Sequence, residues 1–461
     1  MYYYIKTFGC QMNFSDSERI DSFMQNNGFQ KPIFNAEQNL TPEILSQLNV
    51  FIINTCGIRQ MAEDRVFGLV RNLKKDHPQI KIVITGCLAN RRDVHKRMKG
   101  VDLFTEIKDF PEKVESIMKK VLSKKELAAH RPTLYSSNNK KLLSYFNIRP
   151  KYENKFTALV PIMTGCNNFC SYCVVPYARG SEVSRPANEI INEIKNLIKT
   201  GRKHIILLGQ NVNSYNSPSP SGRGVRGEGI QKINFSKLLR KINALPGKFW
   251  ISFVSSHPKD VTDEMITTVA QCKKVCENFH LPVQAGNDKV LQKMNRQYTA
   301  SDYLKIIRKI KNSFKKHKPD CLFAITSDII VGFPGETKKQ FEDSASIMKK
   351  VKYDLVFFGQ FSPRPGTAAW KMKDDVSKKE KERRMKYLNE ILKKTALANN
   401  KKYIGKTIEV LIDFTKSENY FGKTRTGKNV RINSKRKNLV GKIIKVKITK
   451  ANIWNLEGIL P

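Results

Sequence analysis

The sequence from Gly165 to Gly180, GCNNFCSYCVVPYARG, places Cys166, Cys170 and Cys173 in one short loop. Thiolates on a short loop are ligands for a soft metal ion or an iron–sulfur cluster. A structural zinc site normally has a fourth Cys or His nearby, and none follows Cys173 in this stretch. A 4Fe-4S cluster has four iron corners, so three thiolates leave one iron free to bind a substrate. The spacing therefore predicts a cluster with one open coordination site.

The loop lies within a long segment, about residues 152–398, that repeats a strand–helix unit six times. The candidate strands are FTALVPIM, HIILLGQ, FWISFVSS, NFHLPVQ, LFAITSDIIVG and DLVFFGQFS. Six units predict a parallel barrel that is open or incomplete, because a closed barrel has eight; a doubly wound sheet is the alternative. In both folds the functional groups lie at the C-terminal ends of the strands. The Pro-, Gly- and Ser-rich stretch 216–229 is interpreted as a surface insertion.

The first segment, residues 1–125, alternates strand-like runs with amphipathic stretches, which predicts a small parallel α/β sheet. Cys10, Cys56 and Cys87 each directly follow a candidate strand, in YYYIKTFGC, VFIINTC and IKIVITGC. Parallel strands end at the same edge of a sheet, so the sheet would bring the three thiols together. Three thiols again indicate a second cluster with an open iron. The alternative is three small buried hydrophobic side chains.

Local signals mark the ends of one helix and of the first segment. Asn13 or Ser15 is expected to cap the helix after the first strand, and Gly28 is expected to end it. Residues 126–151 are polar and lack periodicity, which predicts a linker. The remaining cysteines follow no comparable pattern and are interpreted as thiols without a role: Cys272, Cys276 and Cys321.

The last segment, residues 401–461, has short β-branched runs (TIEVLI, NVRI and KIIKVKIT) between Gly, Asn and Lys turns, which predicts a small all-β barrel. It holds 15 Lys and Arg against 4 Asp and Glu, a net charge of +11. A basic barrel of this kind is suited to binding RNA, and the alternative is a solvated domain with a Lys-rich face.

The composition of the whole chain also favours a nucleic-acid partner and metal or redox chemistry. A net charge of +42 indicates a polyanionic partner, most simply a nucleic acid, although a Lys-rich genome composition could also produce it. The sequence has no run of about 20 apolar residues to span a membrane. The N-terminus lacks the features of a secretory signal, so we expect a cytoplasmic protein. Nine cysteines in that compartment indicate metal or redox chemistry rather than disulfides.

The cysteine loop resembles the radical S-adenosylmethionine (SAM) superfamily, whose motif is C-x-x-x-C-x-aromatic-C after the first barrel strand; Tyr172 is the aromatic residue here. Nearly the whole chain resembles the radical-SAM methylthiotransferases, which have an N-terminal cluster domain, a radical-SAM core and a C-terminal TRAM barrel. The matching stretches are TFGCQMNFSDSE, INTCGIR, ITGCLANR, LPVQAGNDKVLQKMNRQYT, DIIVGFPGET, FSPRPGT, FGKTRTGKNVRI and VGKIIKVKITKA. The resemblance implies domains at 1–125, 152–398 and 401–461.

GCNNFCSYCVVPYARG, LLGQNVNSY and SSHPKD are most similar to the MiaB branch of this family. The resemblance implies transfer of a methylthio group to carbon 2 of isopentenyl-adenosine beside the tRNA anticodon, at position 37. One SAM would methylate a sulfur held at the N-terminal cluster, and a second SAM would supply the radical. The sister branches act on threonylcarbamoyl-adenosine in tRNA and on a ribosomal-protein aspartate. A non-catalytic iron–sulfur or zinc RNA-binding protein is an alternative from another class.

The same resemblance implies two 4Fe-4S clusters, one on Cys10, Cys56 and Cys87 and one on the loop cysteines. The resemblance implies SAM contacts at Tyr172 and also at Gln210, Ser255, Gln284, Arg296, Gly332 and Glu336. Each can also be a structural polar group. Ala285 and Phe361 depart from the serine and tyrosine usual in the family. An electron donor such as flavodoxin or ferredoxin is expected, and the protein is expected to be a monomer.

Overall fold

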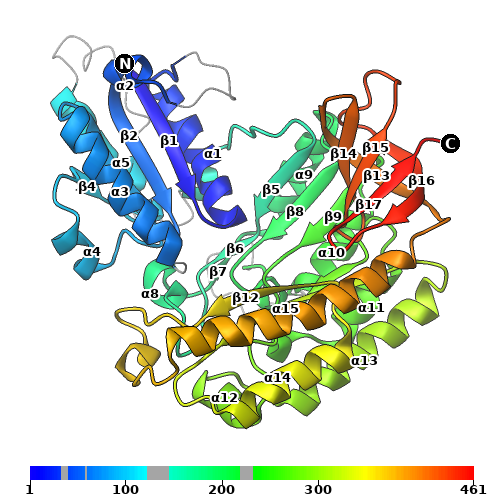
Figure 1. Ribbon diagram of the computed structural model, residues 1–461. Helices are drawn as coiled ribbons and strands as arrows, with labels where there is room; N and C mark the ends of the chain where they lie inside the picture. Colours follow the sequence, from blue (N-terminus) through cyan, green and yellow to red (C-terminus); the bar gives the residue numbers. More distant parts are fainter. Residues whose placement is uncertain (33–39, 58–59, 122–144, 219–231) are drawn as a thin grey trace.

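The computed structural model describes residues 1–32, 40–57, 60–121, 145–218 and 232–461. Three regions follow one another along the chain: an N-terminal parallel sheet, a central set of parallel strands with outer helices, and a C-terminal β-barrel (Figure 1). Most of the insertion expected at 216–229, and of the linker expected at 126–151, lies outside the described residues. Among the described helices, none combines the length and the apolar character that a membrane span requires.

The N-terminal sheet is parallel, and its strands lie in chain order. The strands are β1 (Tyr2–Phe8), β2 (Leu48–Thr55), β3 (Lys81–Gly86) and β4 (Leu103–Phe104). The helices are α1 (Gln11–Asn26), α2 (Pro42–Gln47), α3 (Gln60–Asp76), α4 (Arg92–Arg97) and α5 (Phe110–Val121), with a short 3-10 helix, η1 (Ile107–Asp109). Alternate side chains of β2 point to opposite faces: Val50 and Ile52 pack with α1 and α5, and Phe51 and Ile53 pack with α3. Helices on both faces explain why its central residues, 50–53, are all apolar.

Helix α1 begins earlier than the sequence analysis predicted, because Cys10 occupies the N-cap position. Asn13 and Ser15 are fully buried instead, and the Asn13 side chain hydrogen-bonds to Asn54 of β2. The prediction that either residue is the N-cap was therefore wrong. Asn13 still contributes to capping from position N3, where its Oδ1 accepts from the backbone N–H of Cys10 at 3.3 Å. Gly28 follows the helix with a φ of +77°, as expected of a residue that ends it.

The end of the expected linker is part of the N-terminal core. Tyr145, Phe146 and Ile148 are buried in the same cluster as α1 and α5. Arg19 of α1 lies over the rings of both Tyr145 and Phe146. These three residues therefore return to the first region before the chain enters the central one.

The central region contains the six predicted strands, arranged as two parallel three-stranded sheets. They are β5 (Thr157–Pro161), β8 (His204–Leu208) and β9 (Trp250–Phe253) in one sheet, and β10 (Asn278–His280), β11 (Ala324–Val331) and β12 (Leu355–Gln360) in the other. A parallel bridge between Ile251 and Val275 connects the two sheets. Two short strands, β6 (Met163–Thr164) and β7 (Val183–Ser184), pair beside the cysteine loop. The predicted open parallel barrel is confirmed.

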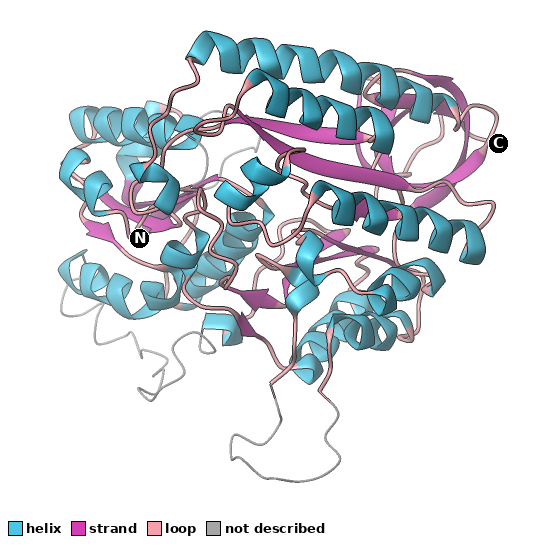
Figure 2. Cartoon of the chain, turned by 90° about the horizontal axis from the view of Figure 1, so that it is seen from below, coloured by secondary structure: helices cyan, strands magenta, loops and turns pink. Residues whose placement is uncertain are grey.

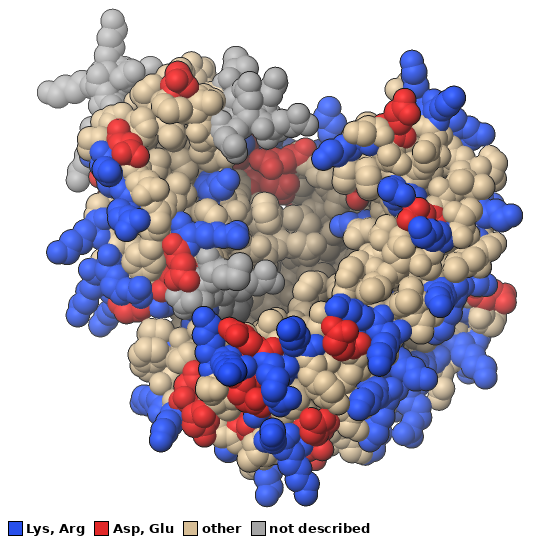
Figure 3. Space-filling view, viewed as in Figure 1, with Lys and Arg blue, Asp and Glu red and all other residues tan. Residues whose placement is uncertain are grey.

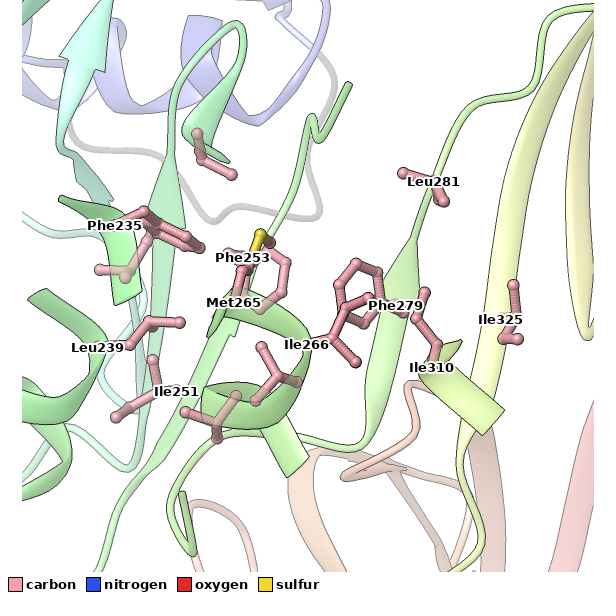
Figure 4. Packing of buried hydrophobic residues seen from close by; sticks show 14 of the residues in the cluster. Phe235, Leu239, Ile251, Phe253, Met265, Ile266, Phe279, Leu281, Ile310 and Ile325 are labelled. Atoms are coloured by element: carbon pink, nitrogen blue, oxygen red, sulfur yellow. The ribbon is translucent and has the colours of Figure 1, made fainter. Parts of the chain in front are cut away.

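Amphipathic helices cover the outer side of these strands (Figure 2). They are α9 (Ala187–Lys199), α10 (Phe235–Asn243), α11 (Asp263–Gln271), α12 (Asp288–Lys293), α13 (Ala300–His317), α14 (Lys338–Val351) and α15 (Lys378–Lys401). The short α8 (Val175–Arg179) instead follows the cysteine loop and faces the N-terminal region. Three short 3-10 helices lie among the described residues of this region: η2 (Val212–Ser214), η3 (Pro258–Asp260) and η4 (Ala368–Lys371). Phe235, Phe253 and Phe279 pack edge to face between strands and helices (Figure 4). The packing of this core determines the positions of the C-terminal ends of the barrel strands.

The C-terminal region is a closed five-stranded barrel in the order β13-β14-β15-β17-β16. Its strands are β13 (Thr407–Lys416), β14 (Asn419–Thr424), β15 (Asn429–Asn433), β16 (Ile443–Ala451) and β17 (Asn455–Ile459). The sequence analysis identified three of these five; β14 and β17 contain Gly and polar residues and lack a long β-branched run. Two partly buried ion pairs attach the barrel to the central region, Arg425 with Glu277 at 2.7 Å and Lys428 with Asp354 at 2.7 Å.

Candidate active site

All three regions line one cavity of about 1070 Å³. Figure 3 shows the molecule hollowed between the N-terminal sheet and the C-terminal barrel, with Lys and Arg spread over the surrounding surface. Six cysteines line this cavity: Cys10, Cys56, Cys87, Cys166, Cys170 and Cys173. We call the first three the N-terminal thiols and the last three the loop thiols. The structure thus brings both predicted sets to the same space, while Cys272, Cys276 and Cys321 lie outside it.

The N-terminal thiols are brought together by strand register. Phe8 of β1 pairs with Thr55 of β2, and Thr55 pairs with Gly86 of β3, so the three strands end level with one another. The backbone N–H of Cys56 donates to the carbonyl of Phe8 at 2.7 Å, and that of Cys87 donates to the carbonyl of Thr55 at 2.9 Å. The sheet ladder therefore continues into the cysteines and sets their spacing.

Close backbone packing surrounds these strand ends. Gly86 has a φ of +87°, and a Cβ at this position would stand 2.4 Å from the carbonyl oxygen of Thr55. A side chain would clash there, and its backbone would be strained. Cys56 and Cys87 are buried, whereas Cys10 is exposed on the cavity wall. Glycine at 86 therefore allows the chain to turn from β3 into Cys87.

The loop thiols are held by local turns rather than by a sheet. Gly165 begins the loop with a φ of +78°, and the backbone N–H of Cys166 donates to the carbonyl of Gly180 at 3.2 Å. The N–H of Cys173 donates to the carbonyl of Cys170 at 2.9 Å. These contacts close a tight loop at the end of β6, at the carboxyl side of the barrel strands.

Burial affects the pKa of two of the loop thiols, Cys166 and Cys173. It raises the pKa of Cys173 to about 12 and also raises that of Cys166. A metal centre bound here would displace these thiol protons, so its binding would release protons. Within the described residues, no three or more His, Cys, Asp or Glu side chains enclose a single metal ion. The thiols of both sets line a cavity wall instead.

A guanidinium group stands against a sulfur of each set. Arg179 Nε donates to Cys87 Sγ at 3.4 Å, and Arg296 Nη1 donates to Cys170 Sγ at 3.4 Å. Both arginines are buried. Soft thiol donors, three to a set, with a cationic hydrogen-bond donor beside them, fit the requirements of an anionic thiolate-bound iron–sulfur cluster.

Most of the expected SAM-contact positions line the same cavity: Tyr172, Gln210, Ser255, Gln284 and Arg296. Gly332 and Glu336 do not line it. The Glu336 carboxylate accepts from the backbone N–H of Gly332 at 2.7 Å and from Arg384 Nη1 at 2.8 Å. It is therefore occupied by structural partners. Ala285 and Phe361, which depart from the family pattern, are both buried in one small apolar cluster.

His257 is a cavity residue that the sequence analysis did not select. Its Nδ1 accepts from the backbone N–H of Lys259 at 3.2 Å, and burial lowers its pKa to about 2. The neutral ring therefore carries its proton on Nε2, which has no hydrogen-bond partner in the described part of the chain. Gln210 Oε1 is likewise buried without a partner there. At this part of the cavity, His257 thus offers an unused donor and Gln210 an unused acceptor.

The motif SSHPKD contained the signal for His257, but only the structure shows what orients it. The Asn213 side chain accepts from the backbone N–H of His257 at 2.9 Å and donates to its carbonyl at 2.8 Å. Asn213 belongs to LLGQNVNSY, so two of the stretches that indicated the family branch are joined to each other.

The C-terminal barrel completes the far wall of the cavity. Thr426, Lys428 and Trp454 of the barrel lie there with Phe357 of β12. Phe357 and Trp454 are exposed large aromatic side chains, at 53% and 46%. Exposed rings on the wall of a basic protein are suited to stacking against nucleic-acid bases.

Comparisons with known proteins agree with this arrangement. The Radical SAM superfamily model matches residues 160–348, the Uncharacterized protein family UPF0004 matches 2–106, and the TRAM domain matches 401–460. A tRNA-2-methylthio-N(6)-dimethylallyladenosine synthase from Clostridium novyi (strain NT) is 38% identical over 99% of this chain and 96% of the relative. The chain belongs to the tRNA-2-methylthio-N(6)-dimethylallyladenosine synthase family. The resemblance indicated by the motifs is thereby confirmed.

Other comparisons support the same family and fold. The synthase of the same name from Carboxydothermus hydrogenoformans is 38% identical, and the alignment covers 99% of each chain. A radical S-adenosylmethionine methyltransferase, TsrM, from Kitasatospora setae has been solved with cobalamin and a 4Fe-4S cluster bound. It shares 13% identity with this chain at a TM-score of 0.54, over 80% of this chain and 76% of that one. At that identity the likeness concerns the fold.

Proposed function

We propose that this enzyme transfers a methylthio group to carbon 2 of isopentenyl-adenosine at position 37 of tRNA, next to the anticodon. The observation that carries the proposal is the single cavity on which two sets of three thiols converge. Carbon 2 of adenine has no proton that a side-chain base can remove at neutral pH. Sulfur insertion there needs both a radical that removes hydrogen and a source of sulfur. Two thiol sets on one cavity provide places for both.

We propose that the loop thiols and the N-terminal thiols each ligate one 4Fe-4S cluster. When bound, such clusters supply one-electron transfer and an iron without a protein ligand, which can hold SAM or sulfide. The chain's own part is to provide the thiolates, hold the two sets on one cavity and exclude water from it. Residues 1–125, 152–398 and 401–461 would then carry the sulfur-bearing cluster, the radical chemistry and the RNA contacts, respectively.

The polar groups at the strand ends are proposed to bind SAM. Gln210 and His257 support this role because their unused acceptor and donor atoms are buried at the cavity. A zwitterionic amino-acid group offers the complementary donor and acceptor. Tyr172, Ser255, Gln284 and Arg296 remain proposed contacts on the strength of their position. Gly332 and Glu336 remain proposed contacts from the family resemblance, at the end of β11.

The RNA contacts are proposed to come from the C-terminal barrel and the cavity rim. The barrel carries a net charge of +11, and its wall of the cavity bears the exposed ring of Trp454. The modified base must leave its stack to reach the thiols, and exposed rings offer replacement stacking. An electron donor such as flavodoxin or ferredoxin, a cytoplasmic location and a monomeric state complete the proposal.

Mass spectrometry of tRNA nucleosides tests this function directly. Cells that lack the gene should accumulate isopentenyl-adenosine without its 2-methylthio form, and the intact gene should restore that form. A gene with Cys170→Ala and Cys56→Ala provides the inactive control. Restoration of a methylthio group on threonylcarbamoyl-adenosine instead would assign the enzyme to the sister branch. Unchanged nucleosides in all strains would favour a non-catalytic RNA-binding role.

A further inference from the structure

Arg179 belongs to the cysteine-loop segment but contacts the other thiol set. It is the last residue of α8 and follows Cys173 closely in the sequence. Its Nη2 donates to Asp16 Oδ2 of α1 at 2.6 Å, and its Nε donates to Cys87 Sγ at 3.4 Å. The segment that contains the loop thiols therefore also places a guanidinium group in contact with an N-terminal thiol.

The contact between Arg179 and Asp16 is directional. The Asp16 carboxylate is 1% exposed, and its second oxygen accepts from the hydroxyl of Tyr145 at 2.7 Å. Guanidinium groups often pair with a carboxylate through two parallel hydrogen bonds, but Arg179 donates to only one oxygen of Asp16. Its Nε–H is left to point at sulfur. The hydrogen-bond chain from Tyr145 through Asp16 holds the guanidinium at Cys87.

The guanidinium also remains charged in this setting. A guanidinium group keeps its proton in proteins, and the Asp16 carboxylate lies 2.6 Å from Arg179 Nη2. A hydrogen bond from a cation to a ligating sulfur stabilises the more negative, reduced state of a cluster. The reduction potential of a cluster on the N-terminal thiols should therefore depend on this side chain.

We propose that Arg179 is a positioning residue for the N-terminal thiols, supplied by the loop of the other set, and that it raises the potential of the cluster held there. The inference rests on the proposed function, which places a cluster on those thiols. One continuous segment would then provide three ligands to one cluster and a cation to the other. The position of the loop segment would therefore affect the reduction potential of the cluster on the N-terminal thiols.

The chain offers a matched control in Arg296, which donates to Cys170 Sγ at the same distance of 3.4 Å. The experiment uses two backgrounds that each retain one thiol set. In the first, the loop thiols are changed to Ala; in the second, the N-terminal thiols are changed to Ala. Each background is reconstituted with iron and sulfide without oxygen. Redox titration followed by electron paramagnetic resonance then gives the potential of the one remaining cluster.

Arg179→Met should shift the potential to a more negative value in the first background and leave it unchanged in the second. Arg296→Met should do the reverse. Arg179→Lys keeps the charge beside Asp16 but lacks the second N–H toward sulfur, so its cluster should also be more negative than that of the parent. The Lys variant provides the test if the Met variant fails to fold.

The outcomes separate the inference from the proposed function. An unchanged potential in a folded Arg179 variant that binds a full complement of iron would overturn the inference alone. A shift in both backgrounds would overturn it as well, because it would indicate a general loss of packing. Failure of the first background to bind any iron with Arg179 intact would overturn the proposed N-terminal cluster, and the inference with it.

Discussion

The two thiol sets reach the same cavity by different means. The loop thiols lie within eight residues of one another and are positioned by turns that begin and end in the same segment. The N-terminal thiols are separated by dozens of residues and meet only because β1, β2 and β3 end level. A local site tolerates change elsewhere in the domain, whereas a site built from strand ends depends on the register of the whole sheet.

The largest effect is expected at the loop thiols. Changing Cys166, Cys170 or Cys173 to Ala should abolish SAM cleavage, because no neighbouring thiol can replace a lost cluster ligand. Formation of 5′-deoxyadenosine with dithionite, measured by liquid chromatography, checks this outcome. Robust cleavage by any of the three variants would separate the radical chemistry from this loop and remove the basis of the comparison.

Changing Cys10, Cys56 or Cys87 to Ala should affect only half of the chemistry. Such a variant should still cleave SAM, since the loop thiols are intact, but should form no 2-methylthio product. Its iron content should fall by about half, because one of two cubane clusters is lost. Iron analysis and nucleoside mass spectrometry make the measurement. Normal methylthiolation would show that these thiols only pack at strand ends.

Gly86→Ala should disturb the sheet-built set specifically. The added Cβ would meet the Thr55 carbonyl at 2.4 Å on a backbone with positive φ. The expected cost is about 1–3 kcal/mol of unfolding free energy, with loss of iron from the N-terminal set and retained SAM cleavage. Urea unfolding and iron analysis check both effects.

Gly68→Ala in α3 is the matched control, because a Cβ there meets nothing within 4 Å. It should stabilise the helix by about 0.5–1 kcal/mol and leave the iron content unchanged. Equal behaviour of the two alanine variants would mean that the strand-end geometry does not hold the N-terminal thiols in place.

The last comparison is between Asn13, beside the N-terminal thiols, and Asn168, in the cysteine loop, where the smallest effect is expected. Asn13 and Asn54 are fully buried and exchange hydrogen bonds of 2.9 and 2.7 Å across α1 and β2. Asn13→Ala leaves Asn54 Oδ1 without its hydrogen-bond donor and should cost about 1–3 kcal/mol. Asn168→Ala at the half-buried loop should change stability by about 0.5 kcal/mol or less. Chemical denaturation of both variants measures the difference, and a larger cost at Asn168 would contradict it.

The sequence was most informative where the chemistry is local or follows strand order. The spacing of Cys166, Cys170 and Cys173 predicts their loop, and placement after apolar runs predicts that Cys10, Cys56 and Cys87 meet. The six core strands follow in the same way, from β-branched runs between amphipathic helices. Strands β14 and β17 were missed because barrel closure, rather than apolar character, determines their pairing.

Contacts between distant segments had no such signal. Nothing local in PYARG predicts that Arg179 reaches Asp16 and Cys87, because the partners lie far away in the sequence. The N-cap of α1 was misplaced for a related reason: Asn13 lies at N3, where its Oδ1 accepts from the N-cap Cys10 N–H and its Nδ2 joins α1 to Asn54 of β2. Burial of Tyr145 in a polar stretch was equally hidden, since its partners come from α1.

The ion pairs that attach the barrel to the core have a consequence for which nucleotide of the RNA can reach the thiols. Arg425 with Glu277, and Lys428 with Asp354, are partly buried contacts that hold the barrel at one place beside the strand ends. If tRNA binds the barrel as proposed, the span from that surface to the thiols is a fixed length. The enzyme would then select its target by distance. An RNA hairpin bound to the barrel can place at the thiols only the nucleotide that lies at one set distance along its loop, whatever the neighbouring bases are.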